Sequence, residues 1–336
     1  MARAALHHTL TSPAASRAAA AGETPPSAEL AERALGDTIY RVAITFFALC
    51  IPILLAMVAW ELFSAGWPTF RRFGAGFLTS SVWNPVAGEF GAAPAIYGTL
   101  VSSFLALLIA VPLALGVSIF LSELAPRALR QPIGFLVDLL TAIPSVVYGL
   151  WGIFVLLPVL RDPVIPFLRD TLGLGATPLF SGPAYGPSIL AAGLILAIMV
   201  LPYVASVSRE VLLAVPRSQR EAALALGATK WEMVRGAVLP YAKSGIMGGV
   251  ILGLGRALGE TMAVTMLIGN RHEISASLLA PGYTMASLIA NEFSEASSDA
   301  HLSALMAVGF ALFAITIIVN AIARLLVRRV AHGSSR

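Results

Sequence analysis

The chain has 336 residues, of which 57% are hydrophobic and only 12% charged, and its mean hydropathy is +0.83. Soluble domains are usually about 45–50% apolar and about 25% charged, so the composition indicates an integral membrane protein. The formal net charge of +4 does not indicate nucleic-acid binding. In a membrane protein the positions of the arginines relative to the membrane are more informative than the net charge. Cys50 is the only cysteine, which excludes a disulfide or a cysteine metal site within one chain.

The first 36 residues are rich in Ala, Ser and Pro and contain no long apolar run. Such a composition predicts a mobile segment, here a cytoplasmic N-terminal tail over 1–36. We expect a membrane domain over 37–330 and a short cytoplasmic tail over 331–336.

Six long apolar stretches follow the tail, at about 42–62, 96–121, 133–160, 188–207, 245–269 and 302–327. Each can cross about 30 Å of hydrocarbon as a helix that rises about 1.5 Å per residue. A β-barrel would instead show alternating segments of about 10 residues. The sequence therefore predicts an all-α membrane protein with six transmembrane helices. Pro144 and Pro202 are expected to kink two of them.

The orientation follows from Arg and Lys in the connections between these stretches. With the N-terminus inside, the cytoplasmic segments carry sixteen of these residues and the outer segments carry five. This asymmetry predicts that both termini are cytoplasmic. The outer loops at about 63–95 and 161–187 are rich in Pro, Gly and aromatic residues, and they are long enough to dock another protein.

The fifth stretch contains two charged residues in "GLGRALGETMAVTMLIG". Arg256 lies about 16 Å into the helix from Gly245, near the bilayer midplane, and Glu260 lies one turn further out. A charge at this depth costs about 2.5–3.5 kcal/mol or more, whereas pairing within a helix returns a few tenths. A place on a translocation path is therefore favoured over a purely structural pair. Asp138 is a second candidate, either as a partner of Arg256 or as a helix-end residue at the inner interface.

The cytoplasmic loop at 209–244 contains "PRSQREAALALGATKWEMVRGAVLPYAKSG". Two capping boxes, at Ser218 and at Thr229, and a glycine at 227 predict a helix, a glycine turn and a second helix. A short helix with small residues fits a groove on a partner protein. The same pattern also suits an amphipathic loop that lies on lipid headgroups.

The loop resembles the EAA loop of ABC importer permeases, which inserts into a cleft of a separate ATPase subunit. The matching residues are Glu221, Ala222, Ala223, Gly227, Leu239 and Pro240. One position departs from the family, because Ala237 stands where Ile is frequent. The chain also lacks the GxxxxGK[ST] nucleotide loop, as expected of a subunit that relies on a separate ATPase.

Four longer segments are similar to phosphate-specific transport permeases of the PstC type: "YGTLVSSFLALLIAVPLALGVSIFLSELAP", "LTAIPSVVYGLWG", "GPSILAAGLILAIMVLPYVASVSREVL" and "GLGRALGETMAVTMLIGN". The resemblance covers nearly all of 40–330, but not the N-terminal tail. It implies the type I ABC importer architecture in the plasma (inner) membrane of a prokaryote. It also implies three protein partners: a second permease of the PstA type, a dimer of ATPase subunits of the PstB type and an extracytoplasmic phosphate-binding protein of the PstS type.

On this resemblance the chain is a transport subunit that has no catalysis and no cofactor of its own, with ATP and Mg²⁺ bound by the partner ATPase and lipid around it. Arg256 would offset the charge of phosphate, and Glu260 would moderate Arg256 so that the anion can leave. Two alternatives stay open. One is a permease for sulfate, molybdate or tungstate, and the other is an ion-coupled secondary carrier.

Overall fold

The computed structural model describes residues 26–183 and 185–332, with side chains over 37–327 apart from residue 184. The chain divides into two units, Met1–Glu61 and Leu62–Arg336. The first described helix, α2 (Pro26–Phe73), crosses this boundary. Residues 1–25 of the expected tail lie outside the described residues, whereas the first eleven residues of α2, from Pro26 onward, fall within the segment expected to be the tail.

Within the described residues, six helices are long and apolar enough to cross a membrane: Asp37–Phe73, Ala93–Leu124, Ser145–Thr171, Ile189–Leu213, Lys230–Leu258 and Asp299–Val327. Within the first unit, α2 leaves most of its apolar side chains exposed, among them Phe46, Phe47 and Leu54. A continuous apolar helix with no core of its own is what lipid contact requires. The six expected spans are thus confirmed in number, and their bounds differ.

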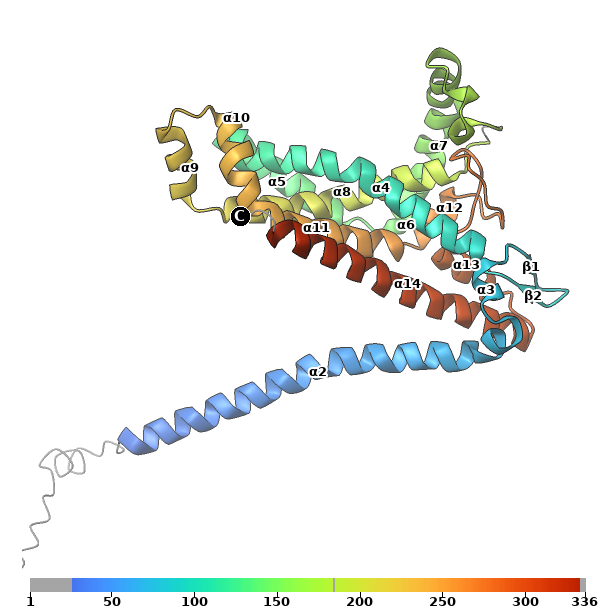
Figure 1. The fold of residues 1–336 in the computed structure, drawn as a ribbon, viewed down its shortest axis with the longest axis horizontal. Coiled ribbons are helices and arrows are strands. Elements are labelled where there is room, and N and C mark those ends of the chain that lie inside the picture. Colours follow the sequence, from blue (N-terminus) through green and yellow to red (C-terminus); the bar gives the residue numbers. More distant parts are fainter. Residues whose placement is uncertain (1–25, 184, 333–336) are drawn as a thin grey trace, which may run out of the picture. The chain divides into compact units, whose positions relative to one another are not determined.

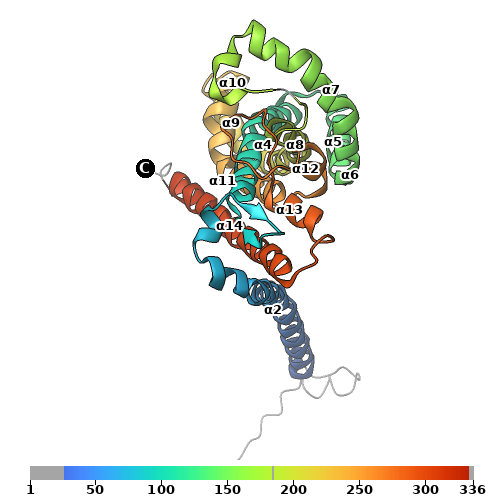
Figure 2. The ribbon, with the colours of Figure 1, turned by 90° about the vertical axis from the view of Figure 1, so that its right-hand side faces the viewer.

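Three helices form the centre of the second unit: α4 (Ala93–Ile119), α8 (Ile189–Leu213) and α11 (Leu239–Leu258). Seen along the bundle, α4 and α8 lie in the middle (Figure 2). Small residues on α4, such as Ala106 and Ala110, are fully buried against α8. Gly253 of α11 faces two valines of α8, where a Cβ would come within 2.8 Å of each. Small side chains let membrane helices approach closely, so these residues explain the tight centre.

The third expected span is not one helix. Instead α5 (Arg127–Ala142) ends before Pro144, and α6 (Ser145–Trp151) begins a new helix that continues through short segments to Thr171. Ile143 has an extended backbone (φ −68°, ψ 127°), the conformation that a following proline favours. The expectation of a kink at Pro144 was therefore wrong, because this proline separates two helices. Pro202 lies within the continuous helix α8.

The segments after α6 alternate between α-helix and wider π-helical turns. They are η2 (Gly152–Leu156), α7 (Leu157–Val159), η3 (Leu160–Val164) and η4 (Phe167–Thr171), followed by the 3₁₀ turns η5 (Leu174–Ala176) and η6 (Pro178–Phe180). The helix thus extends to Thr171, into the loop that we expected to begin at residue 161.

The last helix, α14 (Asp299–His332), packs against the part of α2 that belongs to the second unit. Gly66 faces the backbone of Ala307, where a Cβ would come within 2.9 Å. Phe63 and Phe70 both contact the ring of Phe310, with ring centroids 5.2 and 5.9 Å apart. On its other side α14 lies beside α11 (Figure 1).

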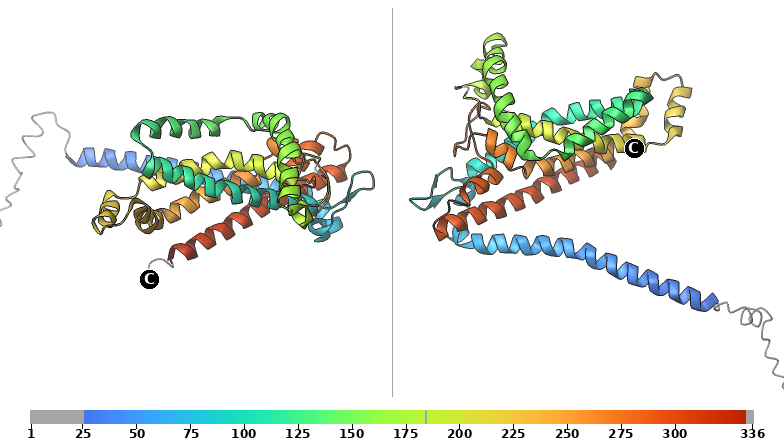
Figure 3. Two further views of the ribbon diagram at one scale, coloured as in Figure 1. Left: turned by 90° about the horizontal axis from the view of Figure 1, so that it is seen from above. Right: turned by 180° about the vertical axis from the view of Figure 1, so that it is seen from behind.

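The two ends of the second unit differ in structure (Figure 3). One end carries α9 (Arg217–Ala225), α10 (Lys230–Met233) and η7 (Val234–Val238). The opposite end carries α3 (Gly76–Thr79), the hairpin of β1 (Trp83–Asn84) and β2 (Glu89–Phe90), and α13 (Met285–Glu292). The strands are antiparallel, with Trp83 opposite Phe90. The π-helical turn η1 (Phe120–Leu124) extends α4 toward the α9 end.

Candidate functional site

The helix that carries Arg256 is broken at the charged residues. Helix α11 ends at Leu258, and α12 (Met262–Leu267) begins after a gap of three residues, so the expected continuous span over 245–269 was wrong. Gly259, a weak helix former, occupies the end of α11. The carboxylate of Glu260 accepts a hydrogen bond from the backbone N–H of Ala263 in the first turn of α12, at 3.4 Å. Irregular backbone at membrane depth is tolerated where it is buried in protein or lines a cavity.

Arg256 and Glu260 form an ion pair across this break. The Nη2–Oε2 distance is 2.9 Å, and the carboxylate side chain is 2% exposed whereas the arginine side chain is 38% exposed. The pair therefore has one buried member, held in place by two donors, and one member that opens to the surface of this chain. Pairing of this kind within a regular helix stabilises little, but the break between α11 and α12 gives this pair a different geometry.

The guanidinium of Arg256 has N–H donors that are not used in hydrogen bonds. Within the described part of the chain it makes the ion pair with Glu260 and no other hydrogen bond, and its Nε is buried without a partner. Its Cζ lies 6.0 Å from the ring centroid of Tyr203 on α8, a cation–π contact. A guanidinium that is fixed on one side by a carboxylate and open on the other can offer a fork of N–H donors to an oxyanion.

Asp138 is not placed beside Arg256. It lies on α5, is exposed, and accepts a hydrogen bond from Ser206 Oγ at 3.0 Å. The link to Arg256 runs through α8, because Ser206 and Tyr203 are one turn apart on that helix. The hydroxyl of Tyr203 donates to the backbone oxygen of Thr141, on α5, at 3.5 Å. Sequence reasoning missed Tyr203 and Ser206, although their three-residue spacing on an apolar helix was a usable signal.

A second group of candidate residues lies at the α9 end of the unit. Glu221 and Ala222 are exposed, and Ala223 is half-buried. Helix α9 ends in a Schellman motif: the N–H of Gly227 donates to Leu224 O at 3.0 Å, and the next N–H donates to Ala223 O at 3.2 Å. Gly227 has φ +85°, which confirms the left-handed position expected for it.

Of the two predicted capping boxes, the one at Thr229 forms and the one at Ser218 does not. Thr229 and Glu232 form theirs, with reciprocal hydrogen bonds at the start of α10. Ser218 does not, because α9 begins at Arg217 and the cap position is occupied by Pro216. Proline just before or within the first turn is already suited to starting a helix, so no side-chain cap is needed there.

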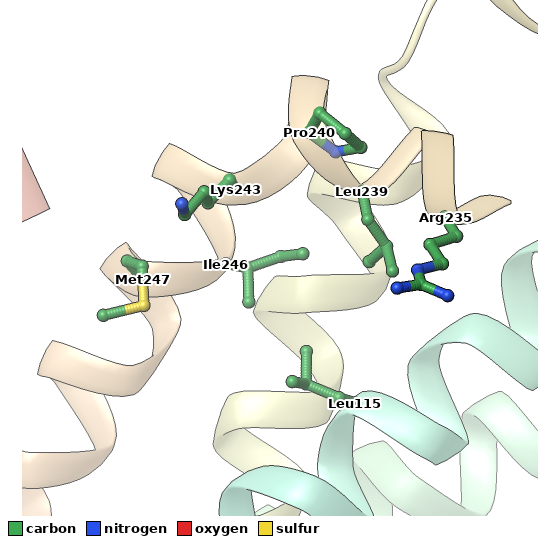
Figure 4. Close-up of a pocket in the computed structure, with 7 residues that line it drawn as sticks. All are labelled: Leu115, Arg235, Leu239, Pro240, Lys243, Ile246 and Met247. Atoms are coloured by element: carbon green, nitrogen blue, oxygen red, sulfur yellow. The ribbon is translucent and has the colours of Figure 1, made fainter. Parts of the chain in front are cut away.

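Leu239 and Pro240, the remaining residues of the EAA pattern, line a mostly apolar groove of about 370 Å³ at the beginning of α11 (Figure 4). Arg235 and Lys243 stand at opposite ends of this groove. Leu239 and Ala223 also pack against one buried cluster, which includes Leu212 and Val234. Ala223 and Leu239, separate in sequence, thus pack together at this end of the unit, whereas Glu221, Ala222 and Gly227 are exposed.

A buried ion pair that sequence reasoning missed anchors α9 to the membrane helices. Arg220 binds Glu123, in the turn η1 that follows α4, with N–O distances of 2.8 to 3.3 Å, and the side chains are 18% and 7% exposed. Arg220 also donates to the backbone oxygens of Leu212 and Val215. The partners are 97 positions apart in the sequence, which explains why no local pattern could reveal the pair.

At the opposite end, Glu292 joins three segments. Its carboxylate accepts hydrogen bonds from Trp83 Nε1 at 2.6 Å, His301 Nε2 at 2.9 Å and His272 Nε2 at 3.1 Å. Burial would raise the pKa of Glu292, but these hydrogen bonds outweigh it and hold the pKa below its ordinary value of 4.5. The hairpin, the loop before α13 and the start of α14 thus converge on one carboxylate.

Glu292→Gln is expected to lower the free energy of unfolding by about 1–3 kcal/mol, because an amide cannot accept from all three donors as a carboxylate does. The lowered pKa of Glu292 means that its contribution is complete above the unfolded-state pKa and is lost as the pH falls through the folded-state pKa, below 4.5. Thermal unfolding of the purified protein at pH 7 and pH 4 measures both effects. Glu295→Gln, an exposed change one turn away, should shift stability by less than about 0.5 kcal/mol. Equal effects of the two variants would contradict the assignment.

The chain matches the family model of the binding-protein-dependent transport system inner membrane component over residues 114–332. A PstC phosphate transport system permease protein of Mesorhizobium japonicum is 50% identical over 88% of this chain and 91% of its own length. That of Xylella fastidiosa is 47% identical over 92% of this chain and 95% of its own. PstC 2 of Mycobacterium tuberculosis is 44% identical over 86% and 91%.

A chain in the crystal structure of a bacterial alginate ABC transporter, in complex with a pentasaccharide-bound periplasmic protein, is a structural neighbour. Its TM-score is 0.57 at 17% identity, over 88% of this chain and 97% of the neighbour. At that identity the likeness speaks for the fold alone, and it confirms the expected architecture of an ABC importer permease. The family match covers residues 114–332, and the three PstC proteins are 44–50% identical to this chain over most of their length. The chain therefore belongs to the binding-protein-dependent transport inner membrane components and, within them, to the PstC family of phosphate transport permeases.

Proposed function

We propose that this chain is the membrane-spanning permease subunit of an ATP-driven phosphate importer and that Arg256 lies on the path of the anion. The observation that carries the proposal is the ion pair at the break between α11 and α12, with Glu260 buried and the guanidinium of Arg256 partly open. The PstC relatives support phosphate as the substrate.

The chemistry of the site suits an anion that must be bound and then released. Phosphate that leaves water inside a membrane needs a compensating charge, and a guanidinium supplies this charge with directed donors. Glu260 holds part of the guanidinium and reduces its attraction for the anion. Because transport requires weak as well as favourable binding, the pair suits passage better than a lone arginine would. Asp138 borders the same path at α5.

The α9 end is proposed to dock a separate ATPase, through Glu221, Ala222, Ala223, Gly227, Leu239 and Pro240. Exposed apolar side chains support this role, since Leu226 is 89% exposed at the tip and Trp231 is 63% exposed on α10. A short helix that ends in a tight glycine turn can enter a groove on a partner. ATP and Mg²⁺ belong to that ATPase, a dimer of PstB-type subunits in this proposal.

The remaining partners follow from the same proposal. A PstA-type permease would complete the path, and a PstS-type phosphate-binding protein would deliver the anion from outside. The excess of Arg and Lys in the connections supports cytoplasmic termini, with the α9 end inside and the hairpin end outside.

Cysteine labelling tests this orientation. In a variant lacking Cys50, a single cysteine at Ala176 or Ser297 should react with a membrane-impermeant maleimide added to intact cells. A cysteine at Ala225, in α9, should react only after the membrane is opened. The opposite pattern would reverse the orientation.

The function itself is tested by reconstitution. The chain is purified with its companion permease and ATPase, placed in lipid vesicles, and supplied with the binding protein and radiolabelled phosphate. Uptake should require ATP, and excess sulfate, molybdate or tungstate should not compete. Competition by one of these anions would favour a permease for another oxyanion. Uptake driven by an ion gradient without the ATPase would favour a secondary carrier.

A further inference from the structure

A polar seam runs between α8 and α5 from Arg256 toward the α9 end. Tyr203 and Ser206 are followed on α8, at the same three-residue step, by Arg209. On α5, the Tyr203 hydroxyl donates to Thr141 O and the Ser206 hydroxyl donates to the carboxylate of Asp138. Because residues three apart share one face of a helix, Arg209 continues this seam.

Arg209 meets α5 at Gly134. A Cβ on Gly134 would come within 2.8 Å of Nη1, 3.1 Å of Cζ and 3.2 Å of Nη2, so the guanidinium as a whole lies against this glycine. Any larger residue at 134 would displace it. The missing side chain therefore creates the space that the cation occupies.

Arg209 has no anionic partner in the part of the chain that the structure describes. It makes no ion pair, its Nε is buried without a hydrogen bond, and the side chain is half-buried. Asp138, one turn from Gly134 on the same helix, accepts from Ser206 and is not within ion-pair distance. Burying part of a cation without a counter-charge costs free energy, and an anion bound at this site would offset that cost.

We propose that Arg209 is a second oxyanion-binding residue, which receives phosphate after Arg256 on the way to the α9 end. This inference rests on the proposed function. Arg209 lies six residues beyond Tyr203, which contacts Arg256, and so stands about 9 Å further along α8 toward the α9 end. Unlike Arg256, which is paired with Glu260, Arg209 forms no ion pair with a carboxylate within the described residues, so its guanidinium stays free for an anion.

A phosphate oxyanion at Arg209 could come from two sources, the transported ion or a phospholipid headgroup, because Arg209 is four residues from the end of α8. Both would use the same guanidinium donors. The proposal is for the transported ion, and the experiment separates the two.

The first measurement is uptake by reconstituted complexes that carry Arg209→Gln or Arg209→Lys. Loss of the charge should lower the maximal rate about tenfold, the scale of one charge-assisted hydrogen bond, while half-saturation by the binding protein stays unchanged. Arg209→Lys should retain most of the rate, and Gly134→Ala should fall between. Arg217→Gln is the control, because it removes one positive charge from an exposed residue at the first position of α9, away from the seam.

The second measurement identifies the ligand. The melting temperature of the detergent-solubilised complex is recorded with inorganic phosphate and, separately, with phosphatidylglycerol. Phosphate should stabilise the unmodified complex more than Arg209→Gln, and the lipid should stabilise both equally. Wild-type uptake by Arg209→Gln, or a loss of the lipid effect alone, would overturn the proposal. Either of these two results would leave the proposed function standing, because Arg256 is intact in the variants and the unmodified complex still imports phosphate.

Discussion

Arg256→Gln is expected to lower phosphate uptake about a hundredfold, which corresponds to a loss of roughly 3 kcal/mol of charge compensation near the midplane. The amide can still donate hydrogen bonds, but it carries no charge for an anion that has left water. Arg256→Lys should be partly active, because the charge remains and the planar fork is lost. Radiolabelled uptake, normalised to the complex recovered from membranes, is the measurement.

The structure adds a necessary control to this experiment. In Arg256→Gln the carboxylate of Glu260, 2% exposed, loses its only cationic partner within the described residues. An uncompensated buried charge destabilises a protein by several kcal/mol, so poor assembly could mimic loss of transport. The double variant Arg256→Gln with Glu260→Gln removes both charges at nearly constant volume. It should assemble as well as the unmodified chain and still fail to import phosphate.

Glu260→Gln alone should behave differently, because the acceptor for Ala263 N–H remains while Arg256 becomes a stronger anion site. Entry should persist and release should slow, seen as a lower maximal rate with phosphate that is retained on the complex. Normal uptake by the double variant would remove Arg256 from the path. Normal uptake by Arg256→Gln would do the same.

Arg220→Ala is expected to cost about 3–5 kcal/mol of stability, because it leaves Glu123 buried and unpaired and removes the donor to two backbone oxygens. Glu123→Gln should cost less, since the amide oxygen still accepts from Arg220 and the arginine keeps its bonds to Leu212 and Val215. The order of the two losses follows from the number of hydrogen bonds that each change removes.

Helix α9 provides the matched control for this prediction. Arg217 begins the same helix and is exposed, so Arg217→Ala should change stability by less than about 0.5 kcal/mol. Thermal unfolding of the purified chain, with uptake by the reconstituted complex, gives both readouts. An Arg220→Ala protein as stable as Arg217→Ala would show that the buried pair does not hold α9 in place.

Several features of this protein could be predicted from the chain alone, because they depend on neighbouring residues. Long apolar runs required six membrane helices, since a backbone in hydrocarbon must satisfy its own hydrogen bonds. The left-handed turn at Gly227 and the capping box at Thr229 were equally local, and both were confirmed. Ser218 is not the cap because α9 begins at Arg217, two residues earlier than a cap at Ser218 requires, with Pro216 at the cap position. The site residues Arg256 and Glu260 stood out because a charge at that depth needs a reason.

Tertiary structure decided what lies beside those residues. The period of an apolar helix cannot show that α11 stops at Leu258, because the break depends on a buried carboxylate that satisfies the next helical turn. Nor can it show which face of α8 meets α5, where Ser206 contacts Asp138 and Arg209 lies on Gly134. The pair of Arg220 and Glu123 joins residues 97 positions apart. Ion pairs and seams of this kind form only when packing brings distant helices together, and the free energy that selects them belongs to the whole bundle rather than to any one segment.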